Sequence, residues 1–73
     1  MDDLALASRV RAALALNPAT AHLRLDVEAR HGRVSIRGKL FQVREMEEIQ
    51  QAVHAVRGVV ECAGNELMPP LPD

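Results

Sequence analysis

The chain has 73 residues, enough for one small domain, and its composition is 48% hydrophobic but 1% aromatic, with one Phe and no Trp or Tyr. A core of this size must be built from aliphatic side chains, and ligand sites made of stacked aromatic rings are excluded. Nine basic and ten acidic residues give a net charge of -1, so the chain as a whole has no field that would hold a polyanion.

Two further features bear on compartment. A single cysteine, Cys62, excludes an internal disulfide. No stretch approaches the roughly 20 apolar residues of a membrane span, and the acidic start Met1-Asp2-Asp3 is unlike a secretory signal. We therefore expect a cytoplasmic location for the chain as it stands, or a periplasmic or envelope location if it is excised from a larger precursor.

The first predicted element is an amphipathic helix that runs to about Leu16. Asp2 or Asp3 can cap its first turn and complement the helix dipole. Asn17-Pro18 ends it, because the residue before proline is disfavoured in the helical region and proline lacks an N–H donor. The side chains expected to be buried share one helical face: Leu6, Ala7, Val10, Ala13 and Leu14.

A hairpin follows, with strands predicted over Leu23–Arg30 and Arg33–Leu40 and a turn at His31-Gly32. Apolar and polar residues alternate with a period of two, so one face of the hairpin is apolar and the other charged. A two-residue connection ending in glycine suits a primed turn. The apolar face comprises Leu23, Leu25, Val27, Ala29, Val34, Ile36 and Leu40.

The turn also predicts the register of the hairpin. Arg30 is expected opposite Arg33, Asp26 opposite Arg37, and Arg24 opposite Lys39. The remaining expected pairs are Glu28 with Ser35, Ala29 with Val34, Val27 with Ile36, Leu25 with Gly38, and Leu23 with Leu40. Gly38, inside a strand, is predicted to mark a bulge or a place where a helix approaches closely.

From about Phe41 the period becomes helical and continues to Arg57-Gly58, where Gly58 can take a left-handed conformation. The predicted buried stripe of this second helix comprises Val43, Met46, Ile49, Val53 and Val56. A third strand is expected from Val59 to about Met68, with a bulge near Gly64 that returns Leu67 to the inner face. The domain is expected at residues 1–68, and residues 69–73 form a Pro-rich tail or linker.

This order of elements predicts an α+β fold. The connection from the second strand through the second helix makes strands two and three parallel. The expected architecture is a two-layer αββαβ sandwich, with two helices on one face of a three-stranded mixed sheet.

Three segments in this order resemble the BON domain, a small bacterial module named for osmotically inducible and nodulation proteins. They are Asn17-Pro18, Gly32-Arg33-Val34-Ser35-Ile36-Arg37-Gly38, and Ala55-Val56-Arg57-Gly58-Val59. The resemblance covers about Leu4 to Leu67, and this chain is one residue longer before Leu67, with Gly64 as the extra position. It implies a binding or attachment module, often for phospholipid surfaces, with no shared catalytic residue. No enzymatic activity and no cofactor are therefore expected.

The outer face of the hairpin carries the candidate ligand-binding residues. They are the basic side chains Arg24, Arg30, Arg33, Arg37 and Lys39, which share the face with Asp26 and Glu28. One interpretation is a patch for anionic phospholipid headgroups. The other is an ordinary solvated sheet face, partly neutralised by an Asp26–Arg37 ion pair. The small excess of charge favours the second interpretation, and the like charges of Arg30 and Arg33 facing each other favour the first.

The remaining candidates point away from catalysis. His22, His31 and His54 share no ligand spacing, so no metal site is expected. Cys62 is expected to be a small apolar residue on an inner strand. Glu45, Glu47 and Glu48 are expected to be an exposed helical charge run, with Arg44 and Glu48 as an ordinary i, i+4 surface pair.

Nucleic acid and protein are the other two classes of partner. Nucleic acid is not expected, because the chain offers no G-x-x-G loop and no stacking aromatic residues. Protein association is the alternative to lipid binding: the domain would self-associate, or dock a fused or partner domain, through an edge strand or the helix layer.

Overall fold

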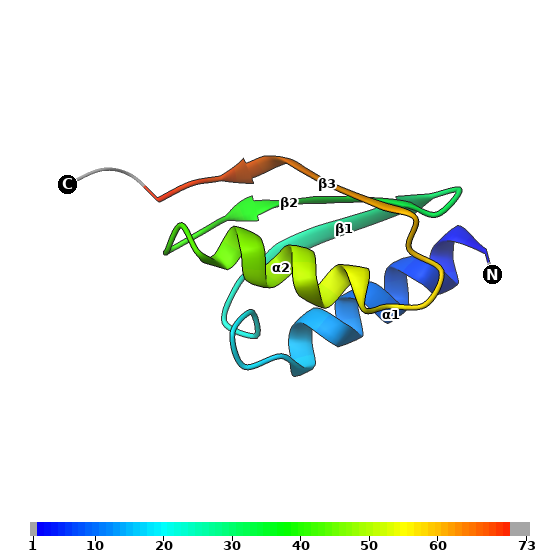
Figure 1. Cartoon of the computed structure of the whole chain (residues 1–73), viewed down its shortest axis with the longest axis horizontal. Coiled ribbons are helices and arrows are strands. Elements are labelled where there is room, and N and C mark those ends of the chain that lie inside the picture. The colour runs from blue at the N-terminus through cyan, green and yellow to red at the C-terminus, as the bar shows by residue number, and fades with distance from the viewer. Residues whose placement is uncertain (1, 71–73) are drawn as a thin grey trace.

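The computed structural model describes residues 2–70. The elements in chain order are α1 (Asp3–Leu16), β1 (Leu25–Arg30), β2 (Arg33–Lys39), α2 (Glu45–His54) and β3 (Glu61–Met68). The three strands form one layer and both helices lie on one side of it (Figure 1). The predicted α+β sandwich of order αββαβ is confirmed.

Helix α1 begins and ends where the sequence predicts. The side chain of Asp2 caps it, since its Oδ1 accepts a hydrogen bond of 2.7 Å from the Ala5 N–H. At the other end Asn17 is extended (φ -86°, ψ 118°) before Pro18. The buried residues of α1 are Leu6, Ala7, Val10 and Leu14.

The hairpin turn is of the primed type. His31 has φ 52° and Gly32 has φ 82°, so both turn residues take the positive φ that this turn requires. The register from Arg30 opposite Arg33 to Leu25 opposite Gly38 is the predicted one.

The hairpin is shorter than predicted at its open end. Strand β1 begins at Leu25, so the expected pairs of Arg24 with Lys39 and of Leu23 with Leu40 lie beyond the ladder. The reason is competition for backbone hydrogen bonds. The Leu23 N–H donates to the Thr20 carbonyl at 3.0 Å within the preceding turn, and the Leu40 N–H donates to the Met68 carbonyl of β3 at 2.9 Å.

Gly38 does not mark a bulge or an approaching helix, and that prediction is wrong. Gly38 pairs regularly with Leu25 across the hairpin. A Cβ atom at this position would lie 2.6 Å from the Arg24 carbonyl oxygen and 2.7 Å from Leu25 Cδ2. Glycine is therefore required here because Arg24 and Leu25, at the start of β1, lie too close for a side chain.

Strand β2 is central, with β1 antiparallel on one side and β3 parallel on the other. The β2–β3 ladder shifts between Ser35 and Arg37, where two residues of β3, Gly64 and Asn65, stand against one residue of β2. Leu67 is 5% exposed and belongs to the core. The predicted bulge near Gly64, and its effect on Leu67, are confirmed.

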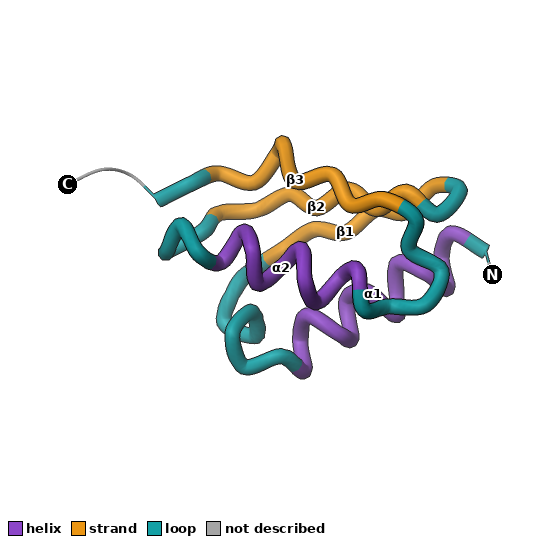
Figure 2. The backbone as a smooth tube through the Cα atoms, viewed as in Figure 1, coloured by secondary structure: helices purple, strands orange, loops and turns teal. Residues whose placement is uncertain are grey.

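Helix α2 is shorter than the sequence pattern suggests. It begins at Glu45, not near Phe41, and ends at His54, while Gly58 takes φ 102° in the turn that follows. Figure 2 shows the loops at both of its ends. Ile49 and Val53 are fully buried as predicted, but Val43 lies in the loop before the helix and is 74% exposed. The prediction that Val43 belongs to the buried stripe is therefore wrong, and so is that for Met46, which lies on α2 but is 38% exposed.

The core fills the space between the sheet and the two helices, and its buried apolar side chains are all aliphatic. Its most deeply buried apolar side chains are Val10, Val34, Ile36, Leu40, Ile49 and Val53. Strand β3 ends at Met68, and residues 71–73 of the predicted Pro-rich tail lie outside the described part of the chain. The domain boundary at residue 68 stays a prediction.

Candidate binding surface

All five predicted basic residues are exposed, and strand alternation places them on the open side of the sheet. Arg30 ends β1, three of the others lie on β2, and Arg24 directly precedes β1. The apolar residues between them point the other way, toward the helices. The structure therefore brings Arg24, Arg30, Arg33, Arg37 and Lys39 to one surface, which we call the open face.

Carboxylates from β1 and β3 share the open face. Arg33 Nε lies 3.4 Å from Glu61 Oε2. Arg37 lies 3.9 Å from Asp26 Oδ2 and 3.8 Å from Glu66 Oε2, so the predicted Asp26–Arg37 pair is present. All of these side chains are more than half exposed, and exposed pairs at such distances contribute little stability. The sequence does not predict the two partners from β3, because only the parallel pairing of β2 with β3 places Glu61 and Glu66 beside the arginines.

Arg24, Arg30 and Lys39 form none of the ion pairs found within residues 2–70. Five basic side chains share the open face with four acidic ones, Asp26, Glu28, Glu61 and Glu66, so the excess is a single positive charge. Arg24 and Lys39 lie at the end of the face away from the hairpin turn, and Arg30 lies at the turn end opposite the ion-paired Arg33.

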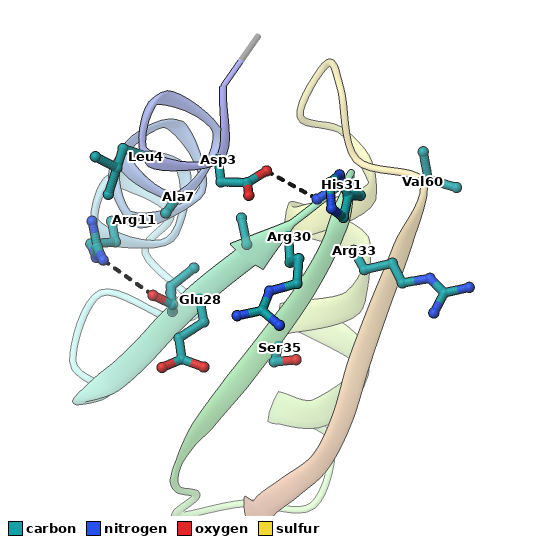
Figure 3. Close-up of a pocket in the computed structure, with 12 residues that line it drawn as sticks. Asp3, Leu4, Ala7, Arg11, Glu28, Arg30, His31, Arg33, Ser35 and Val60 are labelled. Carbon is teal, nitrogen blue, oxygen red and sulfur yellow. Dashed lines mark hydrogen bonds between the residues drawn. The ribbon is translucent and has the colours of Figure 1, made fainter.

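A hollow of roughly 940 Å³ borders the open face at the hairpin turn. Residues from α1, β1, β2 and the segment before β3 line it, including Asp3, Arg11, Arg30, Arg33 and Val60. Figure 3 shows Arg30 running along the hairpin toward Ser35 and Arg33 reaching across β3, so the two guanidinium groups diverge. Their divergence relieves the repulsion expected between opposed like charges.

Two contacts tie α1 to the hairpin around this hollow (Figure 3). Asp3 Oδ1 accepts a hydrogen bond of 2.9 Å from the His31 N–H, and Arg11 Nη2 donates one of 3.1 Å to the Val27 carbonyl. Val27 belongs to an edge strand, so Arg11 satisfies a carbonyl that would otherwise face outward. The sequence gives no signal for either contact, because 16 and 28 residues separate the partners.

Glu45 is buried, and the prediction that it belongs to an exposed charge run is wrong. Its side chain is 6% exposed. Oε1 accepts hydrogen bonds of 2.7 Å from both the Phe41 and Gln42 N–H groups, and Oε2 lies 2.6 Å from His22 Nε2. The bond from the Gln42 N–H to Glu45, three residues later, is half of a capping box, but the Ser or Thr that marks this motif in a sequence is absent at position 42.

The environment of Glu45 keeps it ionised. Burial acts to raise its pKa, but the hydrogen bonds from Gln42, His22 and Phe41, together with the charge of His22, lower the pKa below its ordinary value. A carboxylate held in this way is a poor general base or acid at neutral pH. Arg44, expected to support Glu48, instead donates its Nε to Gln42 Oε1 at 3.0 Å.

The other candidate reactive groups are dispersed. Cys62 is partly buried against the core, as predicted, but it lies on the edge strand β3 and not on an inner strand. Burial raises the pKa of its thiol. Within residues 2–70, no three His, Cys, Asp or Glu side chains form a group that could hold a metal ion. In the same part of the chain, no helix is long and apolar enough to cross a membrane.

The sequence model of one protein family, the BON domain, matches residues 2–65 of the 73-residue chain. The chain belongs to the BON domain family. No curated protein matches it in sequence. BON domains are, as a family, non-catalytic modules known for binding phospholipid.

Proposed function

We propose that this BON domain is a non-catalytic attachment module that binds anionic phospholipid surfaces through its open face. The proposed contacts are Arg24, Arg30, Arg33, Arg37 and Lys39. The observation that supports this best is their common placement: both helices cover one side of the sheet, and all five basic side chains stand on the other.

The ion pairs of the open face do not oppose this function. An exposed pair is worth about 0–1 kcal/mol, and a basic residue near an anionic membrane contributes on the order of 1 kcal/mol. A lipid phosphate can therefore take the place of Glu61, Asp26 or Glu66 at little cost. Because the net excess is a single charge, we expect binding that is weak and strongly dependent on salt.

Vesicle cosedimentation tests this proposal. The chain should sediment with phosphatidylglycerol-containing vesicles at low salt and much less with pure phosphatidylcholine. Arg30→Ser combined with Lys39→Ser should reduce binding about tenfold or more, because two residues of about 1 kcal/mol each are lost.

The matched control is Arg9→Ser with Arg57→Ser, which removes the same charge from exposed sites on α1 and after α2. An equal loss of binding in both double variants would mean that net charge, and not the open face, holds the lipid. No binding of the unmodified chain at low salt would exclude the proposed function.

Protein association is a second candidate, and β3 is the observation that favours it. β3 forms one edge of the sheet, and an edge strand offers backbone groups to another chain. Light scattering over a wide range of concentration tests self-association. A monomer throughout would count against it.

A further inference from the structure

Exposed apolar side chains gather at the end of the domain where β2 and β3 finish. Phe41 is 65% exposed, Val43 74%, Met68 62% and Met46 38%. The hydrogen bond from Leu40 N–H to the Met68 carbonyl, 2.9 Å long, brings β3 beside the start of the β2–α2 loop. Figure 1 shows this loop next to the end of β3, at the opposite end from the hairpin turn. We call Phe41, Val43, Met46 and Met68 the apolar tip.

The loop that exposes Phe41 is held in one shape from within. The buried carboxylate of Glu45 accepts the Phe41 and Gln42 N–H groups and contacts His22, and the rings of His22 and Phe41 have centroids 6.0 Å apart. A preformed loop loses little conformational entropy when it binds. The polar contacts of Glu45 thus hold Phe41 and its apolar neighbours in solvent. In that position these apolar side chains do not contribute to the stability of the fold.

Basic residues surround the apolar tip. Lys39 and Arg44 flank the loop in sequence, and Arg24 adjoins the same end of the hairpin, with its carbonyl against Gly38. None of the three belongs to an ion pair found within residues 2–70. Two carboxylates, Glu47 and Glu48, lie in the first turn of α2, and Glu48 lines the same hollow as Gln42 and Arg44. This arrangement matches the layers of an anionic bilayer. The apolar side chains of the tip would contact the acyl chains, and the basic side chains beside them would contact the phosphates.

The small size of the apolar tip favours a bilayer over a protein as its binding partner. A stable protein interface needs roughly 20–30 residues from each side. Four exposed apolar side chains fall far short of that, whereas membrane affinity accumulates from a few inserted residues.

We infer that the apolar tip inserts into the surface of an anionic bilayer and that Phe41 is its deepest anchor. This inference rests on the proposed lipid-binding function. It adds an orientation, in which the domain meets the membrane tilted toward the end of the open face that carries Arg24 and Lys39.

Tryptophan fluorescence tests the insertion, because the chain has no Trp or Tyr of its own. Phe41→Trp gives a single reporter in the apolar tip, and Leu16→Trp gives a control at an 83% exposed site on α1. With phosphatidylglycerol vesicles, the emission of Phe41→Trp should move to shorter wavelength and be quenched by lipids with brominated acyl chains. The emission of Leu16→Trp should do neither.

Loss of the apolar side chain gives a second measurement. Phe41→Ser should weaken vesicle binding by about three- to tenfold, and Leu16→Ser by less than about twofold. Circular dichroism checks that both variants remain folded.

The outcomes separate this inference from the function on which it rests. Sedimentation with vesicles, but no spectral change in Phe41→Trp, would overturn insertion and leave attachment through the open face standing. No sedimentation at all would overturn both. A shift of Phe41→Trp emission without vesicles, together with a doubled mass by light scattering, would assign the tip to dimer formation and overturn insertion.

Discussion

Glu45 places an ionised group in the interior of a domain whose other buried side chains, apart from Thr20, are aliphatic. Its carboxylate joins three parts of the chain: the loop before α2, the first turn of α2, and the link that carries His22. Burying a charge is unfavourable unless its hydrogen-bonding capacity is satisfied, and here two N–H groups and an imidazole satisfy it. Glu45 therefore has a structural role, and it sets the geometry of the apolar tip.

The lowered pKa of Glu45 predicts a specific dependence of stability on pH. Because the folded-state pKa lies below the unfolded one, its contribution is fully present above the ordinary value and is lost as pH falls through the folded-state pKa. Glu45→Gln should reduce the free energy of unfolding at pH 7 by about 1–3 kcal/mol. As the pH falls below the ordinary glutamate pKa, the variant should also lose less stability than the unmodified chain, because Gln does not titrate.

Urea denaturation followed by circular dichroism at neutral and acidic pH measures both effects. Glu47→Gln, two positions along the same helix and exposed, is the control and should change stability by less than about 0.5 kcal/mol. Similar effects in the two variants would contradict the role assigned to Glu45.

At the scale of the elements, the hairpin is the most closely specified part of the fold. Its turn fixes the register, and the register fixes which side chains reach the open face. Its outer edge, on β1, is protected by α1, since Arg11 donates to the Val27 carbonyl. The β3 edge lies at the opposite side of the sheet, next to the carboxylates that pair with Arg33 and Arg37.

Gly38 supplies a prediction about the hairpin. Gly38→Ala would place a Cβ atom 2.6 Å from the Arg24 carbonyl oxygen, so backbone must move. We expect a loss of about 1–3 kcal/mol in the free energy of unfolding, as for other overpacked sites. Gly64→Ala is the control, because its Cβ would meet the ends of the Leu67 and Gln50 side chains at 3.1 and 3.2 Å, which can shift. Equal losses in urea denaturation would show that strand proximity does not explain the glycine.

At the scale of the whole molecule, stability depends on the packing of two helices against one face of a small sheet. A domain of this length has a free energy of unfolding of roughly 4–11 kcal/mol. One well-buried side chain is therefore a large share of the total.

Ile49, on α2 and 0% exposed, tests this dependence. Ile49→Ala should reduce the free energy of unfolding by about 2–5 kcal/mol through lost burial and a residual cavity. If the domain has a free energy of unfolding of roughly 4 kcal/mol, this loss is enough to unfold much of the population. Met46→Ala, on the same helix at a 38% exposed site, should cost less than about 1 kcal/mol. Thermal and urea denaturation measure both, and a small cost at Ile49 would mean that α2 is not essential to the core.

The sequence by itself determined the order of elements, the turn, the bulge near Gly64 and the five basic residues of the open face. It also determined the hairpin register from the Arg30–Arg33 pair to the Leu25–Gly38 pair. These follow from local rules: periods of two and 3.6, the positive φ of a primed turn, and proline at a helix end. Family membership followed from the same segments, and the match over residues 2–65 confirmed it.

The tertiary structure decided what lies beside each of those residues. It placed Glu61 and Glu66 against Arg33 and Arg37, buried Glu45 under the β2–α2 loop, and turned Val43 outward. The physical reason is that charge neutralisation and burial depend on contacts between segments far apart in the chain, and periodicity carries no information about such contacts. The apolar tip is the clearest case, since Met68 joins Phe41 and Val43 only through the pairing of β2 with β3.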